Sequence, residues 1–254
     1  MLEWACFQKY TQRIQKLRGY LIPNALSSEV FFVLQHCATN KHLFPNTKSV
    51  NLWPNERTVS FIPLLLSLRT TIINILHFGS NSPTRMVTLV IATFPTLCPN
   101  LQKITLHSLP RDPMITAAVS GILLSSSQNT LWYFNMDSPL TEEACQVVYK
   151  LPNLHDLSVV IEKGSSLPSV ALPNLTNLTI KYDHRNDWSW VFHGARFKKL
   201  RAITFHSGSE QVGGFLEAFE RLTLPTSTQS TLSEFCLYTL QSWNPNYSSL
   251  LLFA

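Results

Sequence analysis

The sequence predicts an α/β fold in which one short strand recurs along the chain and builds a curved solenoid. A near-duplicate is the first observation: residues 151–159 read LPNLHDLSV, and residues 172–180 read LPNLTNLTI. The second is that the pattern apolar-x-x-apolar-x-apolar returns elsewhere at spacings from the low twenties to the low thirties. Such periods are typical of leucine-rich repeats, whose units bury their apolar faces only against each other. We therefore expect a leucine-rich repeat solenoid, with a curved parallel sheet and with helices and turns on its convex side.

The strand pattern occurs nine times, and we expect a strand at each place. Ile14 and Leu17 begin the series. Two weak matches follow at residues 47–52 and 70–75, in which a threonine stands at the first apolar position. The fuller matches begin at Leu101, Leu131, Leu154, Leu175, Leu200 and Leu232. We expect a single array over residues 1–254 with about 8 to 9 degenerate repeats. It is expected to be incomplete at both ends, because the apolar run at 250–253 has no polar cap after it.

Helical segments are expected between several of the strands. Residues 27–34, 141–148 and 209–219 each have a polar start followed by apolar residues spaced three and four apart. A hydroxyl cap and acids in the first turn favour a helix there. Residues 84–94 and 113–124 have the length of helices, but β-branched residues and Gly121 disfavour helix. Residues 183–192 are expected to form a loop.

Composition narrows the functional classes. The formal net charge is +5, and no block of Lys and Arg is longer than a pair, so nucleic-acid binding has no specific support. Five scattered cysteines form no Cys-x-x-Cys motif and are expected to be small buried side chains. The chain has neither a secretory signal nor an apolar stretch of about 18 residues, which predicts no membrane partner and an intracellular location, in the cytoplasm or the nucleus.

The finer sequence pattern resembles one protein family. Strand units preceded by Cys-Pro-Asn-Leu or Leu-Pro-Asn-Leu, and the segment EWACFQKYTQRI at residues 3–14, resemble the leucine-rich regions of fungal F-box proteins. The F-box itself, a helical motif of about forty residues that binds a Skp-type adaptor, is absent from this sequence. The resemblance implies the substrate-recognition region of a cullin-based ubiquitin ligase, with a protein substrate as partner. Adaptor and cullin are implied only if the full-length chain has an F-box.

Candidate binding residues follow from the strand pattern. The third, fifth and seventh positions of each unit are expected to point away from the core and to line the concave face, because side chains alternate along a strand. These positions are Lys16, Arg18, Tyr20, Ser49, Asn51, Trp53, Ile72, Asn74, Leu76, Lys103, Thr105, His107, Tyr133, Asn135, Asp137, Asp156, Ser158, Val160, Asn177, Thr179, Lys181, Ala202, Thr204, His206, Glu234, Cys236 and Tyr238. From this set we predict partner binding by Trp53, Lys103, His107, Tyr133, Asn135, Asp137, Lys181, His206 and Tyr238, since aromatic and charged anchors dominate protein interfaces.

No catalytic, cofactor or metal site is expected. The cluster Asp183, His184 and Asp187 is better explained as a solvated loop, because no phosphate-binding loop, nucleophile elbow or metal-binding helix accompanies it. His107 and His206 share a position in the pattern but are separated by three intervening units. The chain is therefore not expected to be an enzyme. Two alternatives remain open: a leucine-rich scaffold or regulatory protein unrelated to ubiquitination, and an enzyme on an unrelated α/β fold.

Overall fold

The structure is a computed structural model in which the chain forms two compact units, residues 1–131 and 132–254. The residues it describes are 2–20, 42–54, 58–76, 78, 82–110, 112–125, 129–140, 142–148, 150–161, 171–172, 174–182, 196–197, 199–207, 233–238 and 250–251. The expected helices at 27–34 and 209–219, the expected loop at 183–192 and Cys37 lie outside these residues. The number of repeats stays a prediction.

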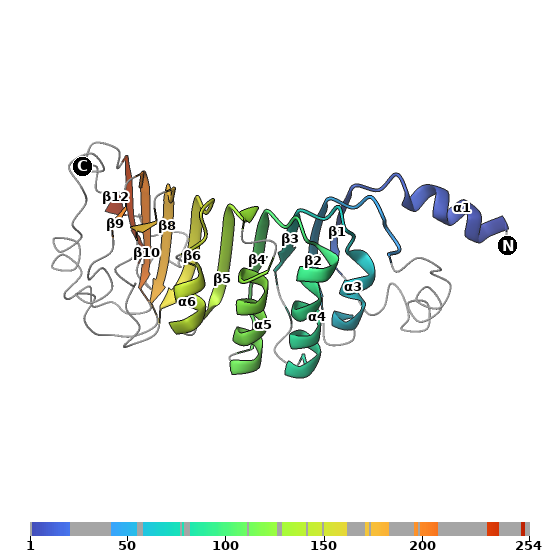
Figure 1. Ribbon diagram of the computed structural model, residues 1–254, viewed down its shortest axis with the longest axis horizontal. Helices are drawn as coiled ribbons and strands as arrows, with labels where there is room; N and C mark the ends of the chain where they lie inside the picture. The colour runs from blue at the N-terminus through green and yellow to red at the C-terminus, as the bar shows by residue number, and fades with distance from the viewer. Residues whose placement is uncertain are drawn as a thin grey trace. The chain divides into compact units, whose positions relative to one another are not determined.

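The first unit consists of parallel strands with helices between them (Figure 1). Its elements are α1 (Leu2–Thr11), β1 (Lys16–Tyr20), β2 (Ser49–Trp53), the 3-10 helix η1 (Val59–Phe61), α3 (Ile62–Leu65), β3 (Ile72–Ile75), α4 (Thr84–Leu97), β4 (Lys103–Leu106) and α5 (Pro113–Leu123). The strands pair in chain order, β1 with β2, β2 with β3 and β3 with β4, and every pair is parallel. Figure 1 shows α3, α4 and α5 side by side on one side of these strands.

The second unit also has parallel strands in chain order. Its elements are β5 (Tyr133–Pro139), α6 (Glu142–Val148), β6 (Asp156–Ile161), β7 (Ala171–Leu172), β8 (Asn177–Tyr182), β9 (Arg196–Phe197), β10 (Ala202–Ser207), β11 (Glu234–Tyr238) and β12 (Leu250–Leu251). The parallel series is β5, β6, β8, β10 and β11, and β7 and β9 form a small sheet of their own. The short β12 pairs antiparallel with β11. An α/β architecture with parallel strands is thus confirmed, and all nine expected strands form where the pattern predicts them.

The apolar positions of neighbouring strands are aligned and form the core. In the first unit Val50 aligns with Ile73 and Ile104, and all three side chains are fully buried. In the second unit the corresponding aligned row is Phe134, Leu157, Leu178 and Ile203, with exposed fractions of 2% or less. Full burial of such a side chain contributes about 1.5 to 3 kcal/mol, and each row is buried because the neighbouring strands contribute to it.

A forked carbonyl recurs where successive strands begin. The residue just before a strand accepts hydrogen bonds from two consecutive N–H groups of the next strand's start. Lys48 O, for example, accepts from Thr71 N at 2.9 Å and from Ile72 N at 3.1 Å. The same arrangement occurs at the carbonyl oxygens of Gln15, Thr71, Trp132, His155, Thr176 and Arg201. Because one carbonyl holds two consecutive residues, the alignment of each strand pair is set at its first residue.

The two weak sequence matches have a buried threonine at the first position. Thr47 and Thr70 are both fully buried, and so are the described leucines at this position, which are Leu101, Leu131, Leu154, Leu175 and Leu200. The hydroxyl groups of Ser67 and Thr70 donate to Thr47 O at 2.8 and 3.0 Å, and Ser67 N donates to Thr70 Oγ1 at 3.0 Å. A buried hydroxyl is costly unless it is paired. The cluster accommodates the hydroxyl of Thr70, whereas Thr47 Oγ1 is buried and has no hydrogen-bond partner among the described residues.

Both helices that the sequence left uncertain are present. α4 buries Val87, Val90, Ile91 and Phe94, which have the three-and-four spacing of one helical face. α5 begins after Asp112, whose side chain accepts from Met114 N at 2.8 Å, with Pro113 in the first turn. Gly121 is exposed, and a Cβ there would meet nothing within 4 Å. The glycine therefore lies on the outer face of α5 and does not prevent the helix. The expected helix at 141–148 forms as α6.

The cysteines follow the expectation in three of the four described cases. Cys98, Cys145 and Cys236 are buried, whereas Cys6 on α1 is exposed, so the expectation is wrong for Cys6. Burial raises the pKa of the Cys98 thiol to about 12, although its hydrogen bonds with Thr70 and Ser67 act in the opposite direction. Cys98 is therefore a neutral core side chain near neutral pH.

The Asn of the Pro-Asn motif has a structural role that can be tested. Asn46 Nδ2 donates to Gln12 O at 2.6 Å, and Asn174 Nδ2 makes the equivalent bond to Pro152 O at 2.7 Å. Each bond joins the segments that precede two neighbouring strands. Replacing Asn46 with Ala is expected to lower the free energy of unfolding by about 1 kcal/mol, because this bond is lost. Chemical denaturation measures the change.

Asn100 provides a matched control for this variant. It stands at the same position before β4, is exposed, and makes no side-chain hydrogen bond to any described residue. Asn100→Ala is expected to change the free energy of unfolding by less than about 0.5 kcal/mol. Equal effects of the two substitutions would show that the bond to Gln12 does not stabilise the fold.

Candidate functional site

In both units the alternate positions of the strands form a face that is separate from the core. β2, β3 and β5 alternate strictly between buried and half-buried side chains. We call the half-buried side the first strand face in residues 1–131. It is made by Lys16, Arg18, Ser49, Asn51, Trp53, Ile72, Asn74, Leu76, Lys103, Thr105 and His107. The second strand face, in residues 132–254, is made by Tyr133, Asn135, Asp137, Asp156, Ser158, Asn177, Thr179, Lys181, Ala202, Thr204, His206 and Glu234.

The first strand face places the predicted residues at its two ends. Lys103 begins β4 and aligns with Ile72. His107 follows β4, and its N–H donates to Ile75 O at 2.9 Å. Trp53 is the last residue of β2 and therefore lies toward the same end as His107, with β3 between their strands. The side chains of Trp53, Lys103 and His107 are all half-buried. The fold thus brings Trp53 and His107 to one end of the face and leaves Lys103 at the other.

The centre of the first strand face is an aligned row of polar residues. Arg18 aligns with Asn51, Asn51 with Asn74, and Asn74 with Thr105. The Oδ1 atoms of Asn51 and Asn74 are buried and have no hydrogen-bond partner among the described residues. An unpaired buried acceptor costs about 1 to 3 kcal/mol. Both oxygens are enclosed as they stand, so a donor from another molecule can reach them only after the amide group turns toward the face.

The second strand face begins with two adjacent aromatic residues. Tyr133 and Trp132 meet edge to face, with ring centroids 5.9 Å apart and an interplanar angle of 75°. Tyr133 is half-buried and its hydroxyl oxygen accepts from Asn135 Nδ2 at 3.4 Å. Trp132 is 38% exposed and was missed by the sequence reasoning, because it precedes the first outward position of its unit. An adjacent Trp-Tyr pair at a strand start is the signal that could have found it.

Three predicted residues occupy adjacent places on neighbouring strands. Lys181 of β8 aligns with His206 of β10, and His206 aligns with Tyr238 of β11. Lys181 and His206 are half-buried; the side chain of Tyr238 is outside the described set. The pattern expected Asp137 to extend this row beside Val160, but Pro139 takes that place, because β5 has a bulge between Asn135 and Pro139. Asp137 nevertheless remains half-buried on the second strand face.

Electrostatic effects connect Asp137, Lys181 and His206. Burial lowers the pKa of Lys181, and the negative charge of Asp137 partly offsets this. Burial also lowers the pKa of His206, and the positive charge of Lys181 lowers it further. The neutral form of His206 is therefore favoured in the folded protein. Sequence spacing alone identified these three residues as candidates, while their interaction depends on the strand alignment and the bulge.

The expected exposure of the alternate positions is wrong in three places. Thr105, Val160 and Cys236 have exposed fractions of 4%, 8% and 4%. Each lies in the interior of its strand. These three residues offer little surface to a partner.

The described residues contain neither a candidate metal site nor a candidate membrane span. Within them, His, Cys, Asp and Glu side chains form no group of three or more that could hold a metal ion. The cluster Asp183, His184 and Asp187 lies outside the described residues. None of the helices in the described part of the chain has both the length and the apolar character of a membrane span.

The lowered pKa of His206 predicts a pH dependence of stability. The unfolded chain binds a proton at His206 more readily than the folded protein does, so stability falls as the pH drops through the ordinary histidine pKa of about 6.5. His206→Gln is expected to reduce this loss, as measured by denaturation at a series of pH values. Lys181→Met is expected to raise the pKa of His206 in an NMR titration, though not fully, since burial persists. An unchanged pKa in that variant would contradict the coupling.

Comparison of the chain with protein-family models, with curated proteins and with solved structures finds no match. The geometry of the two strand faces is therefore the basis for a functional proposal.

Proposed function

We propose that the chain is a leucine-rich repeat solenoid that binds a protein partner through its two strand faces. The observation that carries this proposal is the alignment of polar and aromatic side chains in rows over neighbouring parallel strands, opposite the apolar core. Rows of this kind present many side chains on a rigid support. Such a surface suits recognition of another macromolecule, with a few aromatic and charged residues as anchors.

The wider role rests on the family resemblance. We propose that this chain is the substrate-recognition region of an F-box type ubiquitin ligase, and that it binds substrate without catalysing a reaction. The sequence motifs before the strands support this role. Two of their Asn residues, Asn46 and Asn174, join the segments that precede neighbouring strands. A Skp-type adaptor and a cullin are partners only if the full-length chain has an F-box. The chain of residues 1–254 should capture substrate-side partners alone, and adaptor bound directly to it would contradict the proposal.

Aromatic substitutions test the strand faces directly. Trp53→Ala and Tyr133→Ala are each expected to weaken binding of a captured partner by about 1 to 2 kcal/mol, and Tyr238→Ala belongs in the same series. Tyr10→Ala is the matched control, because Tyr10 is 62% exposed but lies on α1, away from the strands. Biolayer interferometry gives the affinities, and circular dichroism checks the fold. Unchanged affinity in all three strand-face variants would disprove the assignment.

A further inference from the structure

The net positive charge of the protein lies in the first unit. Residues 1–131 contain eleven Lys and Arg but four Asp and Glu, a formal charge of +7, whereas residues 132–254 contain nine and eleven, a charge of −2. Within the described side chains of the first unit, Asp112 is the only carboxylate, and it caps α5. Among the described side chains of this unit, basic groups therefore far outnumber carboxylates.

Three of these basic residues, Lys16, Lys48 and Arg69, lie at or shortly before the starts of β1, β2 and β3, and a fourth, Arg18, lies two residues further along β1. We call Lys16, Arg18, Lys48 and Arg69 the basic edge; all four side chains are exposed. Lys16 aligns with Ser49, the residue after Lys48. The forked carbonyl of Lys48 holds Thr71 and Ile72, and Arg69 N donates to Ser67 Oγ at 3.3 Å. Backbone hydrogen bonds thus hold the edge together.

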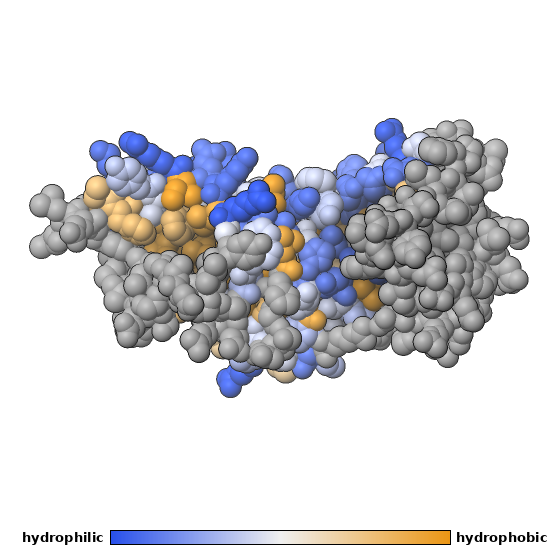
Figure 2. Space-filling model, turned by 180° about the vertical axis from the view of Figure 1, so that it is seen from behind, coloured by the Kyte–Doolittle hydropathy of each residue, from blue (hydrophilic) through white to orange (hydrophobic). Residues whose placement is uncertain are grey.

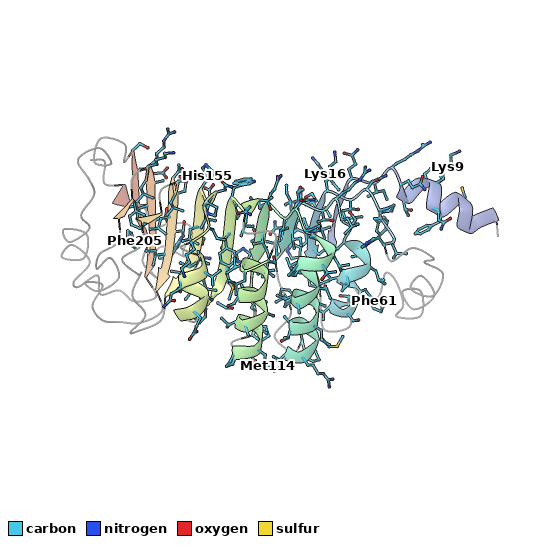
Figure 3. All side chains as sticks on the ribbon, viewed as in Figure 1. Lys9, Lys16, Phe61, Met114, His155 and Phe205 are labelled. Carbon is cyan, nitrogen blue, oxygen red and sulfur yellow. The ribbon has the colours of Figure 1, made fainter. Side chains whose placement is uncertain are left out.

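Figure 3 locates Lys16, one residue of the basic edge, and Figure 2 shows the hydropathy of the surface. In Figure 3, Lys16 lies at the upper margin of the first unit, whereas Met114 lies at the lower margin with the helices. Figure 2 shows hydrophilic residues along the upper margin on the side of the N-terminal unit. The basic edge is therefore separate from the exposed apolar residue at the start of α5.

The neighbouring groups on the first strand face distinguish between possible anions. Beside Arg18 lie the amides of Asn51 and Asn74, whose Oδ1 atoms have no partner among the described residues. Rotation about the broad terminal torsion turns an amide oxygen toward the face. A peptide main chain offers N–H donors to such oxygens, whereas a phosphodiester backbone offers acceptors only. Half-buried Ile72, aligned between Ser49 and Lys103, adds an aliphatic contact that suits an apolar side chain.

We propose that the basic edge and the Asn51–Asn74 pair bind an extended acidic segment of a partner protein, in which Asp or Glu alternates with apolar residues. Its carboxylates meet the basic edge, and its main-chain N–H groups meet the two amide oxygens. Four strands at about 4.8 Å spacing span roughly 14 Å, which an extended peptide crosses with about five residues. This inference rests on the proposed protein-binding function and specifies the chemistry of the segment that the first strand face receives.

A labelled peptide of alternating Glu and Val, about eight residues long, tests the proposal by fluorescence anisotropy with the whole chain. Arg18→Glu is expected to weaken binding by about ten-fold or more, through loss of one charge-assisted contact and gain of a repulsion. Arg85→Glu is the matched control: it makes the same charge change in the same unit, but Arg85 is an exposed residue of α4. Its expected effect is below about three-fold, and it shrinks with added salt.

A second variant separates binding from folding. Asn51→Val with Asn74→Val removes two unpaired buried oxygens, so stability is expected to stay the same or to rise, while affinity for the peptide falls. A loss of stability with unchanged peptide affinity would assign the two amides to the fold and overturn the proposal.

The remaining outcomes of these binding experiments also support or contradict the proposed peptide site. Equal weakening by Arg18→Glu and Arg85→Glu would mean attraction by net charge only, which overturns the site. Tighter binding of a single-stranded oligonucleotide than of the peptide would indicate a nucleic acid in its place. If partner binding depends on Tyr133 but the acidic peptide does not bind, the proposed function stands and this inference fails. If the peptide binds in a way that depends on Arg18, but partner binding is unchanged in every strand-face variant, this inference stands and the proposed function fails.

Discussion

The forked carbonyl that recurs at strand starts in both units is the constraint on which the rest of the structure depends. One backbone oxygen, such as Lys48 O, holds two consecutive N–H groups of the next strand, and the same geometry recurs in both units. Side chains alternate with a period of two, so a slip of one residue would exchange the core face with the strand face. By setting the first residue of each strand, this bond aligns both Val50 with Ile73 in the core and Asn51 with Asn74 on the opposite side.

This alignment also produces the chemistry of the two strand faces. In the second unit it puts Lys181 next to His206, where burial and like charge together favour a neutral imidazole. In the first unit it puts a cation beside two amides with unpaired oxygens. The two units therefore differ in the surface they present, although both have the same strand arrangement. One is strongly basic and the other slightly acidic, so a partner of a given charge has reason to prefer one of them.

Much of the fold could be predicted because burial imposes a simple pattern. The described leucines at the first position of the later strand patterns are buried, and even Thr47 and Thr70 could be placed by their spacing. The candidate residues were found for the same reason, since alternation alone separates them from the core. The errors occur where local geometry departs from the pattern. A bulge in β5 puts Pro139 where Asp137 was expected, and Thr105 is buried. Neither effect is visible in residue spacing.

The sequence by itself determined where the strands lie, which of their residues are apolar and which alternate residues are polar. These properties depend on residues close together in the chain, and so spacing reveals them. Only the tertiary structure decided which polar residues share a row, how deeply each is buried and which amide oxygens have no partner. These properties depend on side chains from strands more than twenty residues apart, brought to neighbouring positions by backbone hydrogen bonds that every residue type except proline can donate.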